Sequence, residues 1–293
     1  MFKFYKKLSL SLFVLINLNI AAAIAQSITY SAVNSDKLTQ ARLEKPSNIF
    51  NAVNSGAVVL LHTGGGCQNS QTRVYADALN NAGFYTLEPC LFNNENERSS
   101  STVIYLPQVF GALKYLAQLP GVDKNKISIL GGSYGAALAF VSATTWAYET
   151  HADKNFPPFV AHAPFYPGCW IYERFIKARV GRSDLPGNAY DRFTGAPVRI
   201  YSGGKDDYDS RDPKACETMI KTISPTNQQL FSLKFFPNAT HKWDGPVSAS
   251  FFDPLACKGR GCMNINTADS AITKEGIEDL LVFLANPISI KLN

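Results

Sequence analysis

The fold that the sequence predicts is decided by one stretch, Lys126-Ile-Ser-Ile-Leu-Gly131-Gly-Ser133-Tyr-Gly135-Ala-Ala-Leu138. A short apolar, β-branched run is followed at once by Gly-x-Ser-x-Gly and then by an Ala- and Leu-rich helical pattern. This order predicts a strand, a very tight turn and a helix, with Ser133 at the tip of the turn. Side chains two residues before or after Ser133 would collide in such a turn, which is why glycine is needed there. A plain glycine-rich turn is the alternative, because the motif alone is a weak signal.

The first 25 residues have the pattern of a secretory signal peptide. A basic start is followed by an apolar run from Leu8 to Ile20 and by an Ala-x-Ala site that ends at Ala25. The apolar run is too short for a membrane anchor, and it contains two asparagines. We therefore expect cleavage after Ala25, a secreted or periplasmic protein, and no stable membrane span in the mature chain, residues 26–293.

The overall charge of the chain comes mostly from this leader. The 293 residues carry a formal net charge of +5, and the leader contributes three lysines and no acidic residue, so the mature chain is close to neutral. There is no basic patch with interleaved aromatic residues, so nucleic acid is not an expected partner. A mature chain of about 268 residues, rich in apolar side chains, suits one sizeable α/β domain over residues 26–293.

Six cysteines remain in the mature chain, an even number that favours disulfides in an exported protein. Two glycines between the last two cysteines would let the chain fold back into a local loop. The other four follow predicted strands, although many connectivities are open on sequence alone. We predict the pairs Cys67–Cys90, Cys169–Cys216 and Cys257–Cys262. No Cys-x-x-Cys pair exists and the four histidines are scattered, so neither a metal nor a cofactor is expected.

Strands and helices alternate along most of the mature chain. This pattern predicts a mostly parallel, doubly wound sheet with helices on both faces. Besides the stretch at 126–138, the expected strands are 56–61, 84–87, 159–162, 197–201 and 230–236. The expected helices are 70–82, 107–119, one that continues from the Ser133 turn to about Trp146, 212–223 and 272–284. We expect one short strand within 27–50, and two short irregular cap excursions at 164–195 and 243–266.

A serine hydroxyl needs a base, and the base needs an orienting carboxylate, before the serine can attack at neutral pH. Ligands of open α/β sheets bind beyond the carboxyl ends of the strands, so the partners should follow strands. Asp206 and His241 each lie in a loop after an expected strand. The chain order Ser133, Asp206, His241 is that of the α/β-hydrolases. Asp207 is a rival for the acid, and Asp206 alone could be only a turn residue.

The chain resembles the dienelactone-hydrolase-like branch of the α/β-hydrolase superfamily. The resemblance rests on His62-Thr-Gly-Gly-Gly, on Val122-Asp123 leading into Gly-Gly-Ser-Tyr-Gly, on Gly203-Gly-Lys-Asp-Asp, and on Pro237-Asn-Ala-Thr-His. It implies the α/β-hydrolase fold and a catalytic triad. Dienelactone hydrolases themselves use a cysteine nucleophile, so a serine in its place favours ordinary ester chemistry.

An oxyanion hole is expected from backbone N–H groups on two segments. They belong to Tyr134, which follows the serine, and to Gly64 and Gly65, where the missing side chains let the backbone approach a substrate. Thr63 stands where related lipases and esterases often have glycine, which is a departure from their pattern.

The sequence thus predicts an exported serine hydrolase that cleaves small carboxylic esters through an acyl-enzyme. In this prediction Ser133 attacks, His241 moves the proton and Asp206 holds the imidazole. A peptidase or amidase of the same fold is one alternative, because the same triad cleaves both bonds. A catalytically silent α/β-hydrolase fold that only binds its ligand is the alternative from another class. The sequence carries no sign of an oligomeric state.

Overall fold

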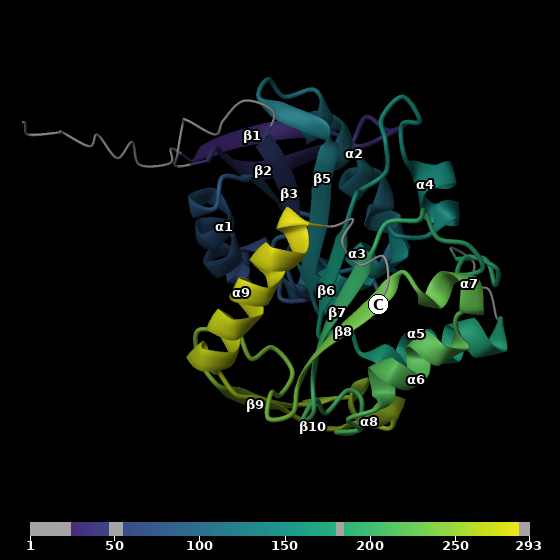
Figure 1. Ribbon diagram of the computed structural model, residues 1–293. Coiled ribbons are helices and arrows are strands. Elements are labelled where there is room, and N and C mark those ends of the chain that lie inside the picture. Colours follow the sequence, from purple (N-terminus) through teal and green to yellow (C-terminus); the bar gives the residue numbers. More distant parts are fainter. Residues whose placement is uncertain (1–24, 47–54, 180–184, 287–293) are drawn as a thin grey trace, which may run out of the picture.

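The structure is a computed structural model, and it describes residues 25–46, 55–179 and 185–286 (Figure 1). The expected signal peptide, residues 1–25, lies outside these ranges except for its last residue. None of the helices within these ranges is both long and apolar enough to cross a membrane.

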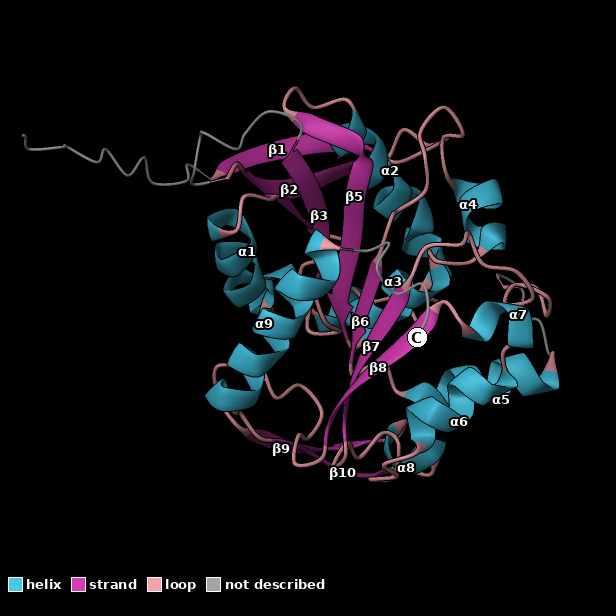
Figure 2. Cartoon of the chain, viewed as in Figure 1, coloured by secondary structure: helices cyan, strands magenta, loops and turns pink. Residues whose placement is uncertain are grey.

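An eight-stranded sheet forms the centre of the molecule (Figure 2). Its strands are β1 (Gln26–Ser31), β2 (Leu38–Glu44), β3 (Ser55–Leu61), β4 (Tyr85–Pro89), β5 (Val122–Gly132), β6 (His162–Phe165), β7 (Val198–Gly203) and β8 (Phe231–Phe236). They lie in the order β1-β2-β4-β3-β5-β6-β7-β8. The pairs β1–β2 and β2–β4 are antiparallel, and all the others are parallel. The mostly parallel sheet is the one predicted.

Helices cover both faces of this sheet, as the alternation of elements predicts. They are α1 (Thr72–Asn81), α2 (Leu106–Ala117), α3 (Tyr134–Val141), α4 (Thr145–His151), α5 (Cys169–Ala178), α6 (Ala215–Thr222), α7 (Pro225–Gln228), α8 (Ala256–Gly259) and α9 (Ser270–Ala285), with 3-10 turns at Cys67–Asn69, Glu95–Glu97 and Val103–Tyr105. One apolar core joins the sheet to α2–α6, and a second joins its other face to α1 and α9 (Figure 1). Burial on both faces explains why β3 reads as a continuous apolar run.

The carboxyl ends of β5 to β8 form one edge of the sheet, and backbone bonds tie the loops that leave it. The amide of Ser133 donates to Phe165 O at 3.0 Å, and that of Tyr166 donates to Tyr201 O at 2.7 Å. The amide of Lys205 donates to Ala239 O at 2.8 Å. The segments after four parallel strands are therefore held side by side, although they are far apart in sequence.

Two expectations about regular elements are wrong near the start of the chain and after the Ser133 turn. Residues 26–44 form two strands instead of one, because alternate residues of β2 pack into the core while the others face solvent. The helix after Ser133 does not continue to Trp146 but ends at Val141. Thr144 caps the N-terminus of α4, and its side chain accepts a hydrogen bond from Ala147 N at 3.1 Å.

Both expected irregular excursions contain regular structure, so that expectation is also wrong. Residues 164–195 include the last part of β6, which was expected at 159–162, and all of α5. Pro164 lies within β6 and Gly168 directly precedes α5, so the sequence around both elements resembles a turn. Residues 243–266 include an antiparallel hairpin of β9 (Ala249–Asp253) and β10 (Cys262–Asn266). The apolar side chains of β9 are all exposed, so no buried face marks it as a strand.

Candidate active site

Ser133 lies in the sharp turn between β5 and α3, with φ 50° and ψ −109°. This is a left-handed conformation that a residue with a side chain seldom adopts. The glycines of the motif make the turn possible. A Cβ atom at Gly131 would lie 2.3 Å from the carbonyl carbon of Gly135, and one at Gly135 would lie 2.5 Å from Leu61 O. The turn therefore presents the serine at the carboxyl edge of the sheet, as the motif predicts.

A continuous hydrogen-bond chain joins Ser133, His241 and Asp206. His241 Nε2 lies 2.9 Å from Ser133 Oγ, and His241 Nδ1 lies 2.8 Å from Asp206 Oδ2. A carboxylate can only accept, so Nδ1 carries the proton and Nε2 is free to accept one from the serine hydroxyl. His241 and Asp206 are both buried. The arrangement has the atoms that proton removal from a serine requires.

The structure also distinguishes Asp206 from Asp207, the two candidates for the carboxylate that contacts His241. Asp206 Oδ1 accepts a hydrogen bond from the amide of Tyr208 at 2.9 Å, which leaves Oδ2 for His241. Asp207 faces elsewhere. Its two oxygens accept from Arg211 Nε at 2.7 Å and from the amide of Ile265 at 2.8 Å. Asp207 therefore holds the β9–β10 hairpin, and Asp206 is the carboxylate that meets the histidine.

The glycines proposed for the oxyanion hole lie in the turn after β3, the neighbour of β5. This turn packs closely against the loop 93–101. Arg98 Nη1 lies 3.4 Å from Gly64 O, and a Cβ atom at Gly64 would lie 2.3 Å from that Nη1. Tyr134 begins α3, and its hydroxyl donates to Ser99 O at 2.9 Å in the same loop. The loop thus fixes both segments from which the oxyanion donors are expected.

His62 supports the turn that carries these glycines. Its Nε2 accepts from the amide of Leu91 at 3.1 Å, and its Nδ1 lies 2.9 Å from Thr63 O. Burial lowers the pKa of His62 to about 4. A neutral ring that bridges two backbone groups is structural, which agrees with its place ahead of the glycine loop.

Two tyrosines flank the imidazole, and the sequence analysis missed both. The ring centroid of Tyr208 lies 4.3 Å from that of His241. The ring centroid of Tyr166 lies 5.0 Å from it, in an edge-to-face orientation. Each follows a strand at the carboxyl edge, and this position was the available signal. Aromatic walls exclude water from the imidazole and restrict its rotation.

The β9–β10 hairpin packs on the loop that carries Asp206. The hydroxyl of Tyr208 donates to Asp253 Oδ2 at 2.5 Å, and the amide of Cys257 donates to Asp207 O at 2.8 Å. The disulfide Cys257–Cys262 closes this hairpin. The cap that follows β8 is thus bonded directly to the acid loop of the site.

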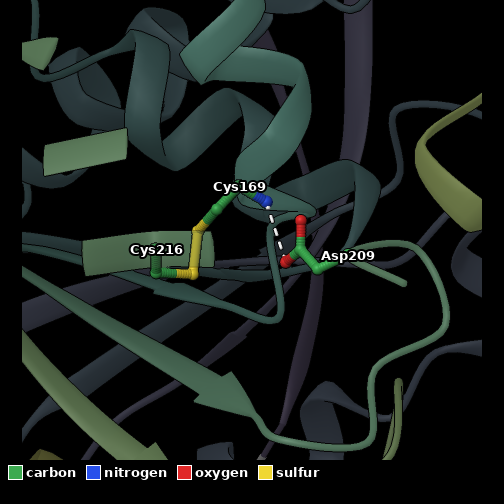
Figure 3. Close-up of side chains that lie close together, drawn as sticks. All are labelled: Cys169, Asp209 and Cys216. Carbon is green, nitrogen blue, oxygen red and sulfur yellow. Dashed lines mark hydrogen bonds between the residues drawn. A yellow bond between two sulfur atoms is a disulfide. The ribbon is translucent and has the colours of Figure 1, made fainter. Parts of the chain in front are cut away.

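The other two disulfides join the pairs Cys67–Cys90 and Cys169–Cys216. The first ties the turn after β3 to the end of β4. The second ties α5 to α6 beside the carboxylate of Asp209 (Figure 3). Two sulfurs and a carboxylate could suggest a metal site, but sulfurs bonded to each other are not thiolate ligands.

Asp209 instead holds the first turn of α5. Its two oxygens accept from the amides of Cys169 at 3.1 Å and Trp170 at 2.8 Å. Burial, and then the negative charge of Asp206, raise the pKa of Asp209 to about 7. The carboxylate is a further group of the site that the sequence analysis missed.

The stability of the protein should therefore depend on pH through Asp209. Its folded-state pKa lies above the ordinary value, so the stabilisation from binding its proton is complete below about pH 4 and is lost as the pH rises through about 7. Asp209→Asn cannot titrate. Relative to the wild type, we expect the variant to be less destabilised at about pH 7.5 than at about pH 4.5. Urea unfolding of both proteins at the two pH values measures this, and an equal difference at both would contradict it.

Comparisons with known proteins bear on the family and the fold of this chain. Residues 40–254 match the sequence model of the dienelactone hydrolase family. Esterase 2 of Thermogutta terrifontis, solved with propionate bound, is similar in structure with a TM-score of 0.62 and 17% identity, over 92% of this chain and 96% of that one. Est1E of Butyrivibrio proteoclasticus gives a TM-score of 0.55 and 15% identity, over 88% and 99%.

A curated protein of Mycobacterium tuberculosis (strain H37Rv), provisionally described as a phosphoribosyl transferase, is 27% identical over 207 residues, which are 69% of this chain and 40% of that protein. The chain thus matches about two fifths of the length of its curated relatives. The solved structures show the α/β-hydrolase fold, and the family match covers most of the chain. The chain belongs to the dienelactone hydrolase family.

Proposed function

We propose that the protein is an exported serine hydrolase that cleaves carboxylic esters through an acyl-enzyme. The observation that carries the proposal is the hydrogen-bond chain from Ser133 Oγ through His241 to Asp206. The family match and the esterases of similar fold support a hydrolase. The six cysteines paired in three disulfides support an oxidising compartment, and so do the basic and apolar first 25 residues of the sequence.

In the proposed first step the Ser133 oxygen bonds to the ester carbonyl carbon while its proton passes to His241 Nε2. Asp206 stabilises the imidazolium that forms. The amides of Tyr134 and of Gly64 or Gly65 donate to the oxyanion, and each such donor contributes about 3–4 kcal/mol. The C–O bond then breaks, and the imidazolium gives its proton to the departing alkoxide. Water repeats the sequence on the acyl-enzyme, and the acid is released.

The surface around the site favours an apolar ester. Of the large apolar side chains that are exposed among the described residues, more than half lie between 247 and 265. Phe252 and Met263 are cross-strand partners in the hairpin, and they are 65% and 50% exposed. The hairpin that carries these side chains is bonded to the acid loop of the candidate site, and exposed apolar groups of this kind can mark a ligand or partner surface. We propose that the acyl or alcohol chain of the substrate lies against this hairpin.

Ser133→Ala should abolish turnover of a short p-nitrophenyl ester while the protein stays folded, because no other group replaces the attacking oxygen. A fluorophosphonate probe should label the wild type at Ser133, and peptide mapping locates the label. Folded wild-type protein that takes no label would favour a binding role. Faster cleavage of a matched amide than of the ester would instead favour the peptidase or amidase alternative.

The two neighbouring carboxylates offer a matched pair of variants. Asp206→Asn keeps the shape but disturbs the tautomer of His241, so we expect kcat to fall about 10³–10⁴-fold. Asp207→Asn removes a bond to the hairpin and should reduce stability, with a change in kcat below about tenfold. Steady-state kinetics on a short ester compares the two. A larger loss of kcat in the Asp207 variant would reverse the assignment.

Phe252→Ser should raise KM about tenfold for an octanoate ester and leave acetate ester kinetics unchanged, because only the long chain reaches the hairpin. Leu38→Ser is the control, since Leu38 has the same 65% exposure and lies on β2, which is next to the edge strand β1 and far from β7 and β8 in the sheet. Kinetics on both esters tests the proposal. An equal change of KM in both variants would show that the acyl chain of the substrate does not lie against the hairpin.

A further inference from the structure

The carboxylate of Asp244 is a buried charge close in sequence to His241. Only Lys242 and Trp243 stand between them, and Lys242 has φ 52°, a left-handed turn that reverses the chain. Burial raises the pKa of Asp244, and hydrogen bonds from Tyr166 and Tyr75 lower it more than the nearby charge of Lys242 does. A buried carboxylate is costly unless hydrogen bonds compensate it, so these two partners are structurally important.

Two tyrosine hydroxyls from distant elements supply those hydrogen bonds. Tyr75 of α1 donates to Asp244 Oδ2 at 2.7 Å. Tyr166, at the end of β6, lies 2.7 Å from Oδ1 and 2.8 Å from Oδ2. Burial, more than any other cause, raises the pKa of both phenols well above its usual range, so both remain protonated donors.

Tyr166 also connects Asp244 to the turn that carries the serine. Its backbone has φ 40°, and its ring lies 5.0 Å from that of His241. A Cβ atom at Gly132 would lie 2.5 Å from the Tyr166 hydroxyl. One side chain therefore packs on the residue before Ser133, on the imidazole and on the Asp244 carboxylate. Strained residues that the surroundings hold in place gather at functional sites.

We propose that Asp244, held by Tyr75 and Tyr166, is a positioning residue that fixes His241 relative to Ser133. This inference rests on the proposed function of the same site. Proton transfer requires His241 Nε2 to stay in line with Ser133 Oγ, and a displacement of about 1 Å can reduce the rate about 10²-fold. A small cavity lined by Thr63 and Gln71 adjoins the carboxylate, so Asp244 is not packed tightly on every side.

Tyr75→Phe tests the inference, because the Tyr75 hydroxyl bonds to Asp244 and to no member of the triad. We expect kcat on a short p-nitrophenyl ester to fall about tenfold with KM within about twofold. The downfield proton resonance of His241 Nδ1–H, in its bond to Asp206, should shift or broaden. This second readout does not depend on turnover.

Tyr30→Phe is the matched control. Tyr30 is also buried, and its hydroxyl donates to Gln108 O at 3.0 Å, between β1 and α2 and away from the site. This variant should lose stability but keep the wild-type kcat and resonance. If Tyr75→Phe matches Tyr30→Phe in both readouts, the positioning role is overturned. If the wild type has no esterase activity but the resonance moves in Tyr75→Phe alone, the positioning role stands and the proposed reaction does not.

Discussion

The strained backbone of Ser133 is the constraint on which the rest of the site depends. A left-handed serine is unfavourable alone, and β5 and α3 hold it only because Gly131 and Gly135 let their backbones come together. The amide of Ser133 is then bonded to the end of β6, which fixes the turn to the sheet edge. Asp206 and His241 are placed relative to that edge by β7 and β8, the strands that precede them.

The loops beyond this edge form a bonded layer of their own. Hydrogen bonds of Asp207 and Tyr208 join the acid loop to the hairpin. The ring of Tyr208 also packs on that of His241 in the histidine loop. Asp209 and the Cys169–Cys216 disulfide attach α5 to the same layer. The sheet thus sets the edge at which the side chains of the site lie, and the contacts among the loops set the distances between these side chains. A change in the hairpin can therefore displace the imidazole of His241.

The sequence predicts the sheet well, because strands buried on both faces consist of continuous apolar runs. It also predicts the turn at Ser133, because only glycine fits at Gly131 and Gly135. It also places Asp206 and His241, since each closely follows a strand. It does not separate Asp206 from Asp207, because both occupy the same turn and only the three-dimensional path of the hairpin assigns them. Residue spacing in the sequence does not reveal the contacts among Tyr75, Tyr166 and Asp244, because these residues come together only through tertiary packing. The hairpin is missed because its exposed apolar strand lacks a buried face.

The distance along the chain between Ser133 and His241 has a consequence for the life of the protein before it folds. The two residues are 108 positions apart, and parallel strands must assemble before they meet. An unfolded chain therefore carries an ordinary serine hydroxyl with no base beside it. The exported serine hydrolase that we propose would therefore be chemically inert during synthesis and passage through a membrane. It would gain its reactivity only when the whole sheet edge has formed.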